Sequence, residues 1–191
     1  MKNIKIGYAM CGSFCTIEKS LIQLKKLVDL SADIMPIFSE TVYNTDTRFT
    51  MADKLIENVE QLTNKKIIHS VKGTEPIGPK NLLDLLIICP CTGNTISKIA
   101  NGITDSSVTM AAKAHLRNNK PVLLAIATND ALSRSAENIG KLLNTKNIYF
   151  VPFGQDDAIK KPTSMICDFE KLIPAAQFAL AGKQMQPIII G

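Results

Sequence analysis

Short apolar runs alternate with amphipathic stretches along most of this chain, and this alternation limits the folds that it can adopt. Five apolar runs have the composition of strands buried on both faces: Ile4–Ala9, Ile34–Phe38, Leu85–Ile88, Val122–Ile126 and Ile148–Phe150. Four amphipathic stretches predict helices: Thr16–Ser31, Ala52–Leu62, Ser107–Arg117 and Ala131–Leu143. Strands that alternate with helices indicate βαβ units around a parallel sheet.

The segments between and after these elements complete the expected architecture. Phe38–Thr50 and Val71–Lys80 are rich in turn residues and read as loops at strand ends, where such sheets bind ligands. After Pro152 we expect a polar segment, Gly154–Thr163, and then a helical stretch interrupted at Pro174. We therefore predict an α/β fold for residues 1–191: one domain with a C-terminal helical tail, built as a three-layer, doubly wound parallel sheet of the flavodoxin-like or Rossmann-like type.

Composition and charge exclude several classes of function. No apolar run approaches the roughly 18 residues of a membrane span, and the N-terminus lacks a signal sequence, so we expect a cytoplasmic protein. Five cysteines without a secretory signal are expected to be reduced thiols, and their spacings do not fit zinc, so no metal site is predicted. The net charge of +5 comes from scattered lysines, and aromatic residues make up only 5%. This pattern favours a solvated basic surface that attracts anionic substrates and disfavours nucleic-acid binding.

A glycine-containing turn follows the first predicted strand. Gly7 and Gly12 have the spacing of a Walker A loop, but Ser13 and Phe14 stand where that loop needs Lys and then Ser or Thr. The turn instead suits a single phosphate, held by backbone amides and by the hydroxyl groups of Ser13 and Thr16, with Ser39 after the second strand as a further donor. A tight turn at Gly12 and a helix cap at Thr16 would explain the same residues without any ligand.

A second polar segment follows the run at Leu85–Ile88. It reads Cys89-Pro90-Cys91-Thr92-Gly93-Asn94-Thr95 and continues to Lys98, Gly102 and Asp105. This segment resembles the flavin-binding signature of the homo-oligomeric flavin-containing cysteine decarboxylases, and the Gly12-Ser13 turn matches their phosphate element. That family carries a catalytic histidine about 14 residues before the signature proline. Here Pro76 occupies that place, and His69 lies seven residues earlier.

Further strings give the whole chain a more specific resemblance, to the family of dipicolinate synthase B subunits. They are Thr47–Phe49, Glu75–Lys80, Thr104–Lys113, Ala127–Leu132, Thr145–Asp157 and Lys160–Met165. The resemblance implies conversion of dihydrodipicolinate to dipicolinate (pyridine-2,6-dicarboxylate) during sporulation, in the mother cell. It also implies a partner, the NADP-binding A subunit, and a homo-oligomeric state. FMN is the cofactor that it implies for this chain.

The candidate site residues follow from these two readings. Asp105 and Asp130 are candidate bases, although carboxylates at predicted helix starts commonly act as caps. Arg48 and Lys80 are candidates for binding substrate carboxylates, although loop cations are commonly solvated. The candidate cofactor-binding residues are Gly12, Ser13, Thr16, Ser39, Pro90, Thr92, Asn94, Thr95 and Thr128. Two alternative functions stay open: a stand-alone FMN-dependent decarboxylase, and a non-catalytic subunit that only binds its partner.

Overall fold

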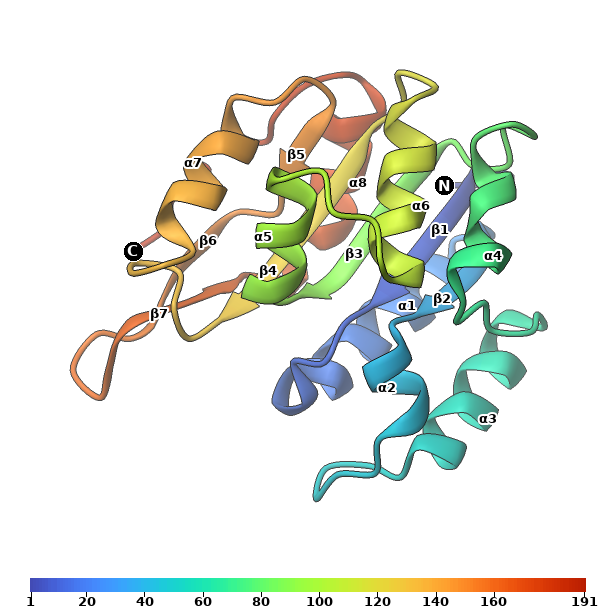
Figure 1. Cartoon of the computed structure of the whole chain (residues 1–191), viewed down its shortest axis with the longest axis horizontal. Coiled ribbons are helices and arrows are strands. Elements are labelled where there is room, and N and C mark those ends of the chain that lie inside the picture. The colour runs from blue at the N-terminus through green and yellow to red at the C-terminus, as the bar shows by residue number, and fades with distance from the viewer.

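Five parallel strands form the centre of the molecule, in the order β2-β1-β3-β4-β5 (Figure 1). The structure is a computed structural model that describes all residues, 1–191. The strands are β1 (Lys5–Met10), β2 (Asp33–Phe38), β3 (Leu85–Cys91), β4 (Val122–Thr128) and β5 (Ile148–Phe150). All seven residues of β3 are buried, as the continuous apolar run requires for a strand covered on both faces. The five predicted strands are confirmed.

Helices cover both faces of this sheet, which gives the predicted three layers. On one face lie α1 (Ile17–Asp29) and α8 (Leu172–Leu180), and on the other lie α5 (Gly93–Ala100), α6 (Ser107–Leu116) and α7 (Ala136–Leu143) (Figure 1). Near β2 lie α2 (Glu40–Asn44), α3 (Ala52–Thr63) and α4 (Val71–Thr74). Three short 3₁₀ turns complete the chain: η1 (Phe14–Thr16), η2 (Glu75–Ile77) and η3 (Phe169–Lys171).

The polar segment after residue 152 is a β-hairpin, which the sequence did not predict. Its strands are β6 (Phe153–Asp157) and β7 (Lys161–Cys167), and β7 pairs antiparallel with the carboxyl half of β4 at Ala127 and Thr128. The sheet therefore has seven strands and is not wholly parallel. The hairpin tip is solvated, so its side chains carry no continuous apolar signal. Figure 1 shows the hairpin projecting from the sheet, beyond the carboxyl end of β4.

Other local predictions were wrong for identifiable reasons. Pro174 does not interrupt α8, because it lies in the first turn, where a missing backbone N–H costs no helical hydrogen bond. The polar segment after β3 contains a helix that the sequence did not predict: α5 begins at Gly93, and Thr92 caps it by accepting a hydrogen bond from the Thr95 backbone N–H. The segment from Ala131 to Ser135 forms turns, and α7 begins only at Ala136. The two predicted loops contain α2, and α4 with η2.

One cluster of 48 buried apolar residues runs through the sheet and the helices on both faces. None of the helices combines the length and apolar character needed to cross a membrane.

Candidate functional site

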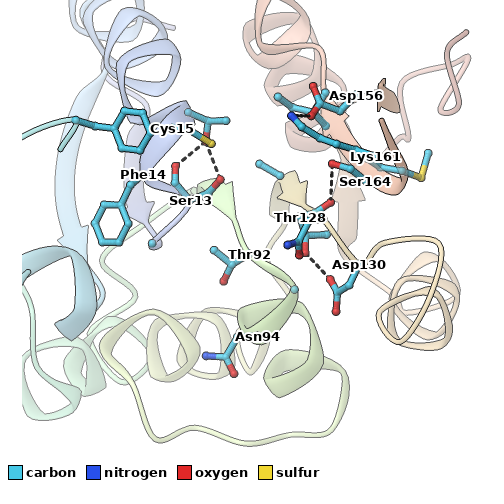
Figure 2. Close-up of a pocket in the computed structure, with 18 of the residues that line it drawn as sticks. Ser13, Phe14, Cys15, Thr92, Asn94, Thr128, Asp130, Asp156, Lys161 and Ser164 are labelled. Atoms are coloured by element: carbon cyan, nitrogen blue, oxygen red, sulfur yellow. Dashed lines mark hydrogen bonds and ion pairs between the residues drawn. The ribbon is translucent and has the colours of Figure 1, made fainter. Parts of the chain in front are cut away.

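A cavity of about 770 Å³ opens at the carboxyl ends of β1, β3 and β4. Parallel α/β sheets bind ligands at this edge, because the loops after neighbouring strands meet there. Figure 2 shows Ser13 and Cys15 on one wall, Lys161 and Ser164 on the opposite wall, and Thr92 and Asn94 between them. The lining residues are Gly12–Thr16, Arg48, Phe49, Thr92–Asn94, Ala127–Asp130, Asp156, Lys161 and Ser164–Ile166.

The turn after β1 presents unused hydrogen-bond donors to this cavity. The backbone N–H of Gly12 donates to no acceptor within the chain. Thr16 donates its hydroxyl proton to the backbone oxygen and the Oγ of Ser13, at 2.8 and 3.1 Å, which leaves the Ser13 hydroxyl proton free. Neither Ser13 nor Thr16 caps a helix with its side chain. Gly12 does not adopt a positive φ, so the turn itself does not require glycine. Helix capping and turn geometry therefore do not explain the glycine and hydroxyl residues of this turn. A bound anion would accept hydrogen bonds from their free donors.

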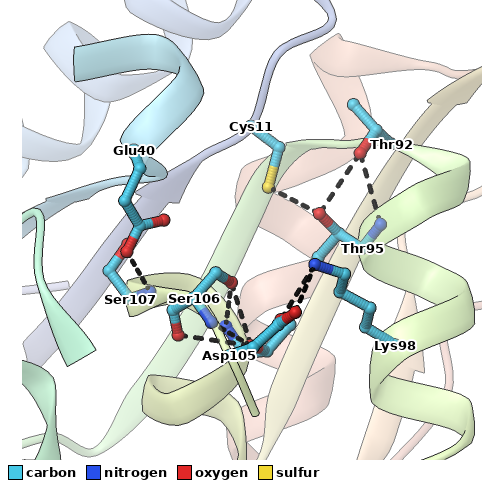
Figure 3. A network of polar contacts seen from close by, with 9 residues as sticks. Cys11, Glu40, Thr92, Thr95, Lys98, Asp105, Ser106 and Ser107 are labelled. Carbon is cyan, nitrogen blue, oxygen red and sulfur yellow. Dashed lines mark hydrogen bonds and ion pairs between the residues drawn. The ribbon is translucent and has the colours of Figure 1, made fainter. Parts of the chain in front are cut away.

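The segment after β3 contributes Thr92, Gly93 and Asn94 to the cavity. Thr95 is buried behind them, and its hydroxyl donates to Cys11 Sγ at 3.2 Å (Figure 3). Burial raises the pKa of the Cys11 thiol to about 11, so it stays protonated at neutral pH. Pro90 does not line the cavity; its carbonyl accepts a hydrogen bond from the Cys11 backbone N–H. Of the predicted cofactor residues in this segment, Thr92 and Asn94 thus line the cavity. Thr95 and Pro90 lie behind it and hydrogen-bond to Cys11.

Asp130 is held beside the first turn of α5. Its Oδ1 accepts hydrogen bonds from Thr128 Oγ1 at 2.5 Å and from Ser135 Oγ at 3.0 Å. Contrary to prediction, Asp130 does not stand at a helix start. Turns follow it instead, because its backbone carbonyl accepts hydrogen bonds from the amides of Ser133 and Ser135. Its carboxylate is half-buried, lines the cavity and has a fixed orientation, as a general base requires.

Besides Pro90 and Thr95, three further predicted site residues lie outside the cavity. Asp105 precedes α6 and is paired with Lys98, whose Nζ lies 2.8 and 2.9 Å from its two carboxylate oxygens (Figure 3). This hydrogen-bonded partner lowers the pKa of Asp105, and Ser106 provides the helix cap instead. Ser39 caps α2 by accepting from the Val42 N–H at 3.3 Å. Lys80 precedes β3 and therefore lies at the opposite edge of the sheet.

The cavity carries two cationic side chains, of which only Arg48 was predicted. Arg48 lies in the loop between α2 and α3 and stacks over the Phe49 ring, with 4.8 Å between its Cζ and the ring centroid. The other is Lys161 at the start of β7, whose Nζ lies 2.6 Å from Asp156 Oδ2. This hydrogen bond raises the pKa of Lys161 and keeps it protonated. The sequence predicted only a polar segment here, because Lys161 is brought to the cavity by the pairing of β7 with β4.

The remaining reactive side chains do not form a second site. All five cysteines are free, and no group of three His, Cys, Asp or Glu side chains has the arrangement of a metal site. His69 stacks on Tyr43, with ring centroids 3.7 Å apart, and does not line the cavity. His115 is buried with its Nε2 3.0 Å from the Pro121 carbonyl oxygen. Both histidines therefore have structural contacts.

Comparison with known proteins supports the resemblance read from the sequence. The flavoprotein family model matches residues 1–177. The dipicolinate synthase B subunit of Bacillus subtilis is 45% identical over 190 residues, which cover 100% of this chain and 95% of that protein. The crystal structure of the dipicolinate synthase B subunit from Bacillus halodurans has a TM-score of 0.91 at 44% identity, covering 100% and 99% of the two chains. The FMN-dependent cysteine decarboxylase SpaF shares the fold, with a TM-score of 0.68 at 17% identity over 93% of this chain and 97% of that one. This chain belongs to the flavoprotein family and, within it, to the family of dipicolinate synthase B subunits.

Proposed function

We propose that this chain acts with a pyridine-nucleotide-binding A subunit to oxidise dihydrodipicolinate to dipicolinate in the cytoplasm of a sporulating cell. The observation that carries the proposal is the cavity at the carboxyl edge of the sheet, which combines an oriented carboxylate, Asp130, with cationic side chains suited to an acidic substrate. The full-length similarity to dipicolinate synthase B subunits supports the same reaction.

The proposed reaction removes one hydride and one proton from the dihydropyridine ring. NADP⁺ on the A subunit is the final acceptor of the hydride and becomes NADPH, and the proton passes to a base. Asp130 is the proposed base, because its Oδ1 is occupied by two hydroxyl donors and its Oδ2 accepts no hydrogen bond within the chain. Asp105 is not retained for this role, since it lies outside the cavity and is paired with Lys98. Formation of the aromatic pyridine drives the oxidation.

FMN is the cofactor proposed for the same cavity. The residues fit its phosphate: the Gly12 amide and the Ser13 hydroxyl offer free protons, and Thr16 orients Ser13. Thr92 and Asn94 would hold the ring with polar contacts, and a cavity of about 770 Å³ lies within the ~300–1,000 Å³ range of ligand pockets. When bound, FMN would supply a two-electron carrier between the substrate ring and NADP⁺. The FMN-dependent decarboxylases that share the fold support this assignment.

The first test is an assay with freshly generated dihydrodipicolinate and NADP⁺, comparing this chain alone, the A subunit alone and the two together. We expect dipicolinate, read by its ultraviolet absorbance, only from the mixture. Size-exclusion chromatography of the mixture then measures the proposed association and the homo-oligomeric state. Full activity from the A subunit alone would contradict the proposal and leave this chain without a role in the reaction.

A stand-alone FMN-dependent decarboxylase is the weaker candidate. The decarboxylase histidine is replaced by Pro76, which lies in η2 before β3 and does not line the cavity. His69 does not replace it, because it stacks on Tyr43 outside the cavity. The release of CO₂ from a cysteine-containing substrate by the FMN-loaded chain would support this alternative. We expect none.

A further inference from the structure

The two cations of the cavity come from opposite flanks of the sheet. Arg48 follows α2 at the β2 end of the strand order, whereas Lys161 begins β7 at the other end (Figure 1). Both line the cavity, and the remaining 17 of its 19 lining residues include no Lys or Arg. Figure 2 shows the Lys161 side chain extending along the wall opposite Ser13 and Cys15. The cavity thus offers two separate positive groups and not one concentrated basic patch.

Two separated cations match the shape of the proposed substrate. Pyridine-2,6-dicarboxylate and its dihydro precursor carry two carboxylates, one on each side of the ring nitrogen, which diverge from each other. One monovalent cation neutralises only one of them, so two cations that approach from different sides can recognise both. Lys80, the second cation expected from the sequence, lies at the far edge of the sheet and cannot contribute.

The contacts of Lys161 leave it available for this role. Its ammonium has three donors and uses one on Asp156, at 2.6 Å. The pair is solvent-accessible, with side-chain exposures of 58% and 31%, so Asp156 holds Lys161 at the wall without burying it. Its neighbour Lys160 differs: it lies in the hairpin tip, where its backbone N–H donates to Asp157 Oδ1, and it does not line the cavity.

We propose that Lys161 binds the second carboxylate of the dicarboxylate substrate while Arg48 binds the first, so that the β6–β7 hairpin determines the preference for a diacid. This inference rests on the proposed function and adds a specificity-determining residue to it. Asp156 is then a positioning residue, which keeps Lys161 directed into the cavity before substrate arrives.

The test is calorimetric titration of the full chain, alone and with the A subunit, with dipicolinate and with the monoacid picolinate (pyridine-2-carboxylate). Because both ligands chelate metals, all solutions are freed of divalent cations. We expect the wild type to bind dipicolinate roughly tenfold or more tightly than picolinate, as one added charged hydrogen bond predicts. Lys161→Gln should remove most of this difference by weakening dipicolinate binding alone, whereas Arg48→Gln should weaken both ligands.

Control variants show whether the preference for the diacid depends on Lys161 itself. Lys160→Gln removes the same charge one residue away and should leave both affinities within about twofold, since screened exposed charges act weakly. Lys161→Arg should keep the preference for the diacid, and FMN affinity should be unchanged in Lys161→Gln. Equal effects of Lys161→Gln and Lys160→Gln would overturn the assignment of Lys161 while leaving the proposed reaction intact. If the wild type binds no dipicolinate in either form, both the assignment and the proposed substrate site are wrong.

Discussion

Gly93 and Asp130 are fitted to each other: a Cβ atom added to Gly93 would lie 2.6 Å from Oδ1 of Asp130. The same Cβ would lie 2.7 Å from Thr128 Oγ1 and 2.8 Å from Ser135 Oγ, the two hydroxyls that hold this carboxylate. Cβ atoms do not tolerate contacts below 3.0 Å with fixed atoms, so a side chain at position 93 displaces the cluster. The absence of a side chain at the start of α5 therefore makes room for the candidate base.

The first prediction is that Gly93→Ala moves Asp130 and lowers the activity of the proposed two-subunit enzyme. Overpacking of this kind costs about 1–3 kcal/mol in the free energy of unfolding, offset in part by the better helix propensity of alanine. Urea denaturation and steady-state kinetics measure the two effects. Gly140→Ala is the control, because a Cβ there meets no atom within 4 Å and alanine inside α7 should stabilise by about 0.5–1 kcal/mol. Equal behaviour of the two variants would contradict the prediction.

The second prediction separates the two candidate bases. Asp130→Asn should lower kcat of the complex by about 100-fold or more, because an amide cannot accept the ring proton. The fold should be kept, since the amide oxygen still accepts from Thr128 and Ser135. Asp105→Asn should leave kcat within about twofold, because Asp105 lies on the exposed side of α5 and α6, away from the cavity. A loss of kcat in Asp105→Asn alone would reverse the assignment.

The third prediction concerns the proposed phosphate site at Gly12 and Ser13. Ser13→Ala should weaken FMN binding roughly tenfold, the value of one hydrogen bond to a charged group. Riboflavin, which lacks the phosphate, should bind the variant and the wild type equally. Quenching of flavin fluorescence measures both affinities. A parallel loss for both flavins would mean that Ser13 contacts the ring or supports the turn and does not hold the phosphate.

The fourth prediction is a pH dependence of stability from His115. Burial lowers the pKa of His115 from 6.5 to about 4, and the neutral ring donates its Nε2 proton to the Pro121 carbonyl. Between these two values the unfolded chain binds a proton that the folded chain does not. The free energy of unfolding should therefore fall as the pH falls from 6.5 to 4, by about 3 kcal/mol in total.

Urea denaturation at several pH values between 4 and 7.5 measures this dependence. His115→Gln keeps an N–H donor but does not titrate, so its stability should change less over the same interval. The comparison of the two slopes removes the contribution of carboxylates, which is common to both proteins. Identical slopes would mean that His115 is accessible to protons in the folded chain.

The local pattern of apolar residues was sufficient to predict the parallel strands at the centre of the fold. A strand buried on both faces is apolar at its buried positions, and the runs that became β1 to β5 have that composition, apart from the exposed Lys5 at the start of β1. The turn after β1 was also readable, because its glycine and hydroxyl residues directly follow a strand and precede a helix. Ser13, Thr92 and Asn94 were named at positions that follow predicted strands, whereas Thr128 and Asp130 were named from the family resemblance; all five line the cavity. Placing the first three at one edge needs only neighbouring residues and the rule that parallel strands end at the same edge.

Two features could be recognised only in the tertiary structure: the β6–β7 hairpin, and the lysine that reaches the cavity. The strands β6 and β7 are held by backbone hydrogen bonds to each other and to β4, and the exposed side chains toward the hairpin tip leave no continuous apolar signal. Lys80 and Lys161 look alike in the sequence, as cations in polar segments. Whether either reaches the cavity depends on which end of the sheet its segment meets and on which strand it pairs with. Lys80 precedes β3, which places it at the opposite edge of the sheet. Lys161 reaches the cavity only because β7 pairs with β4, a contact between residues more than 30 positions apart.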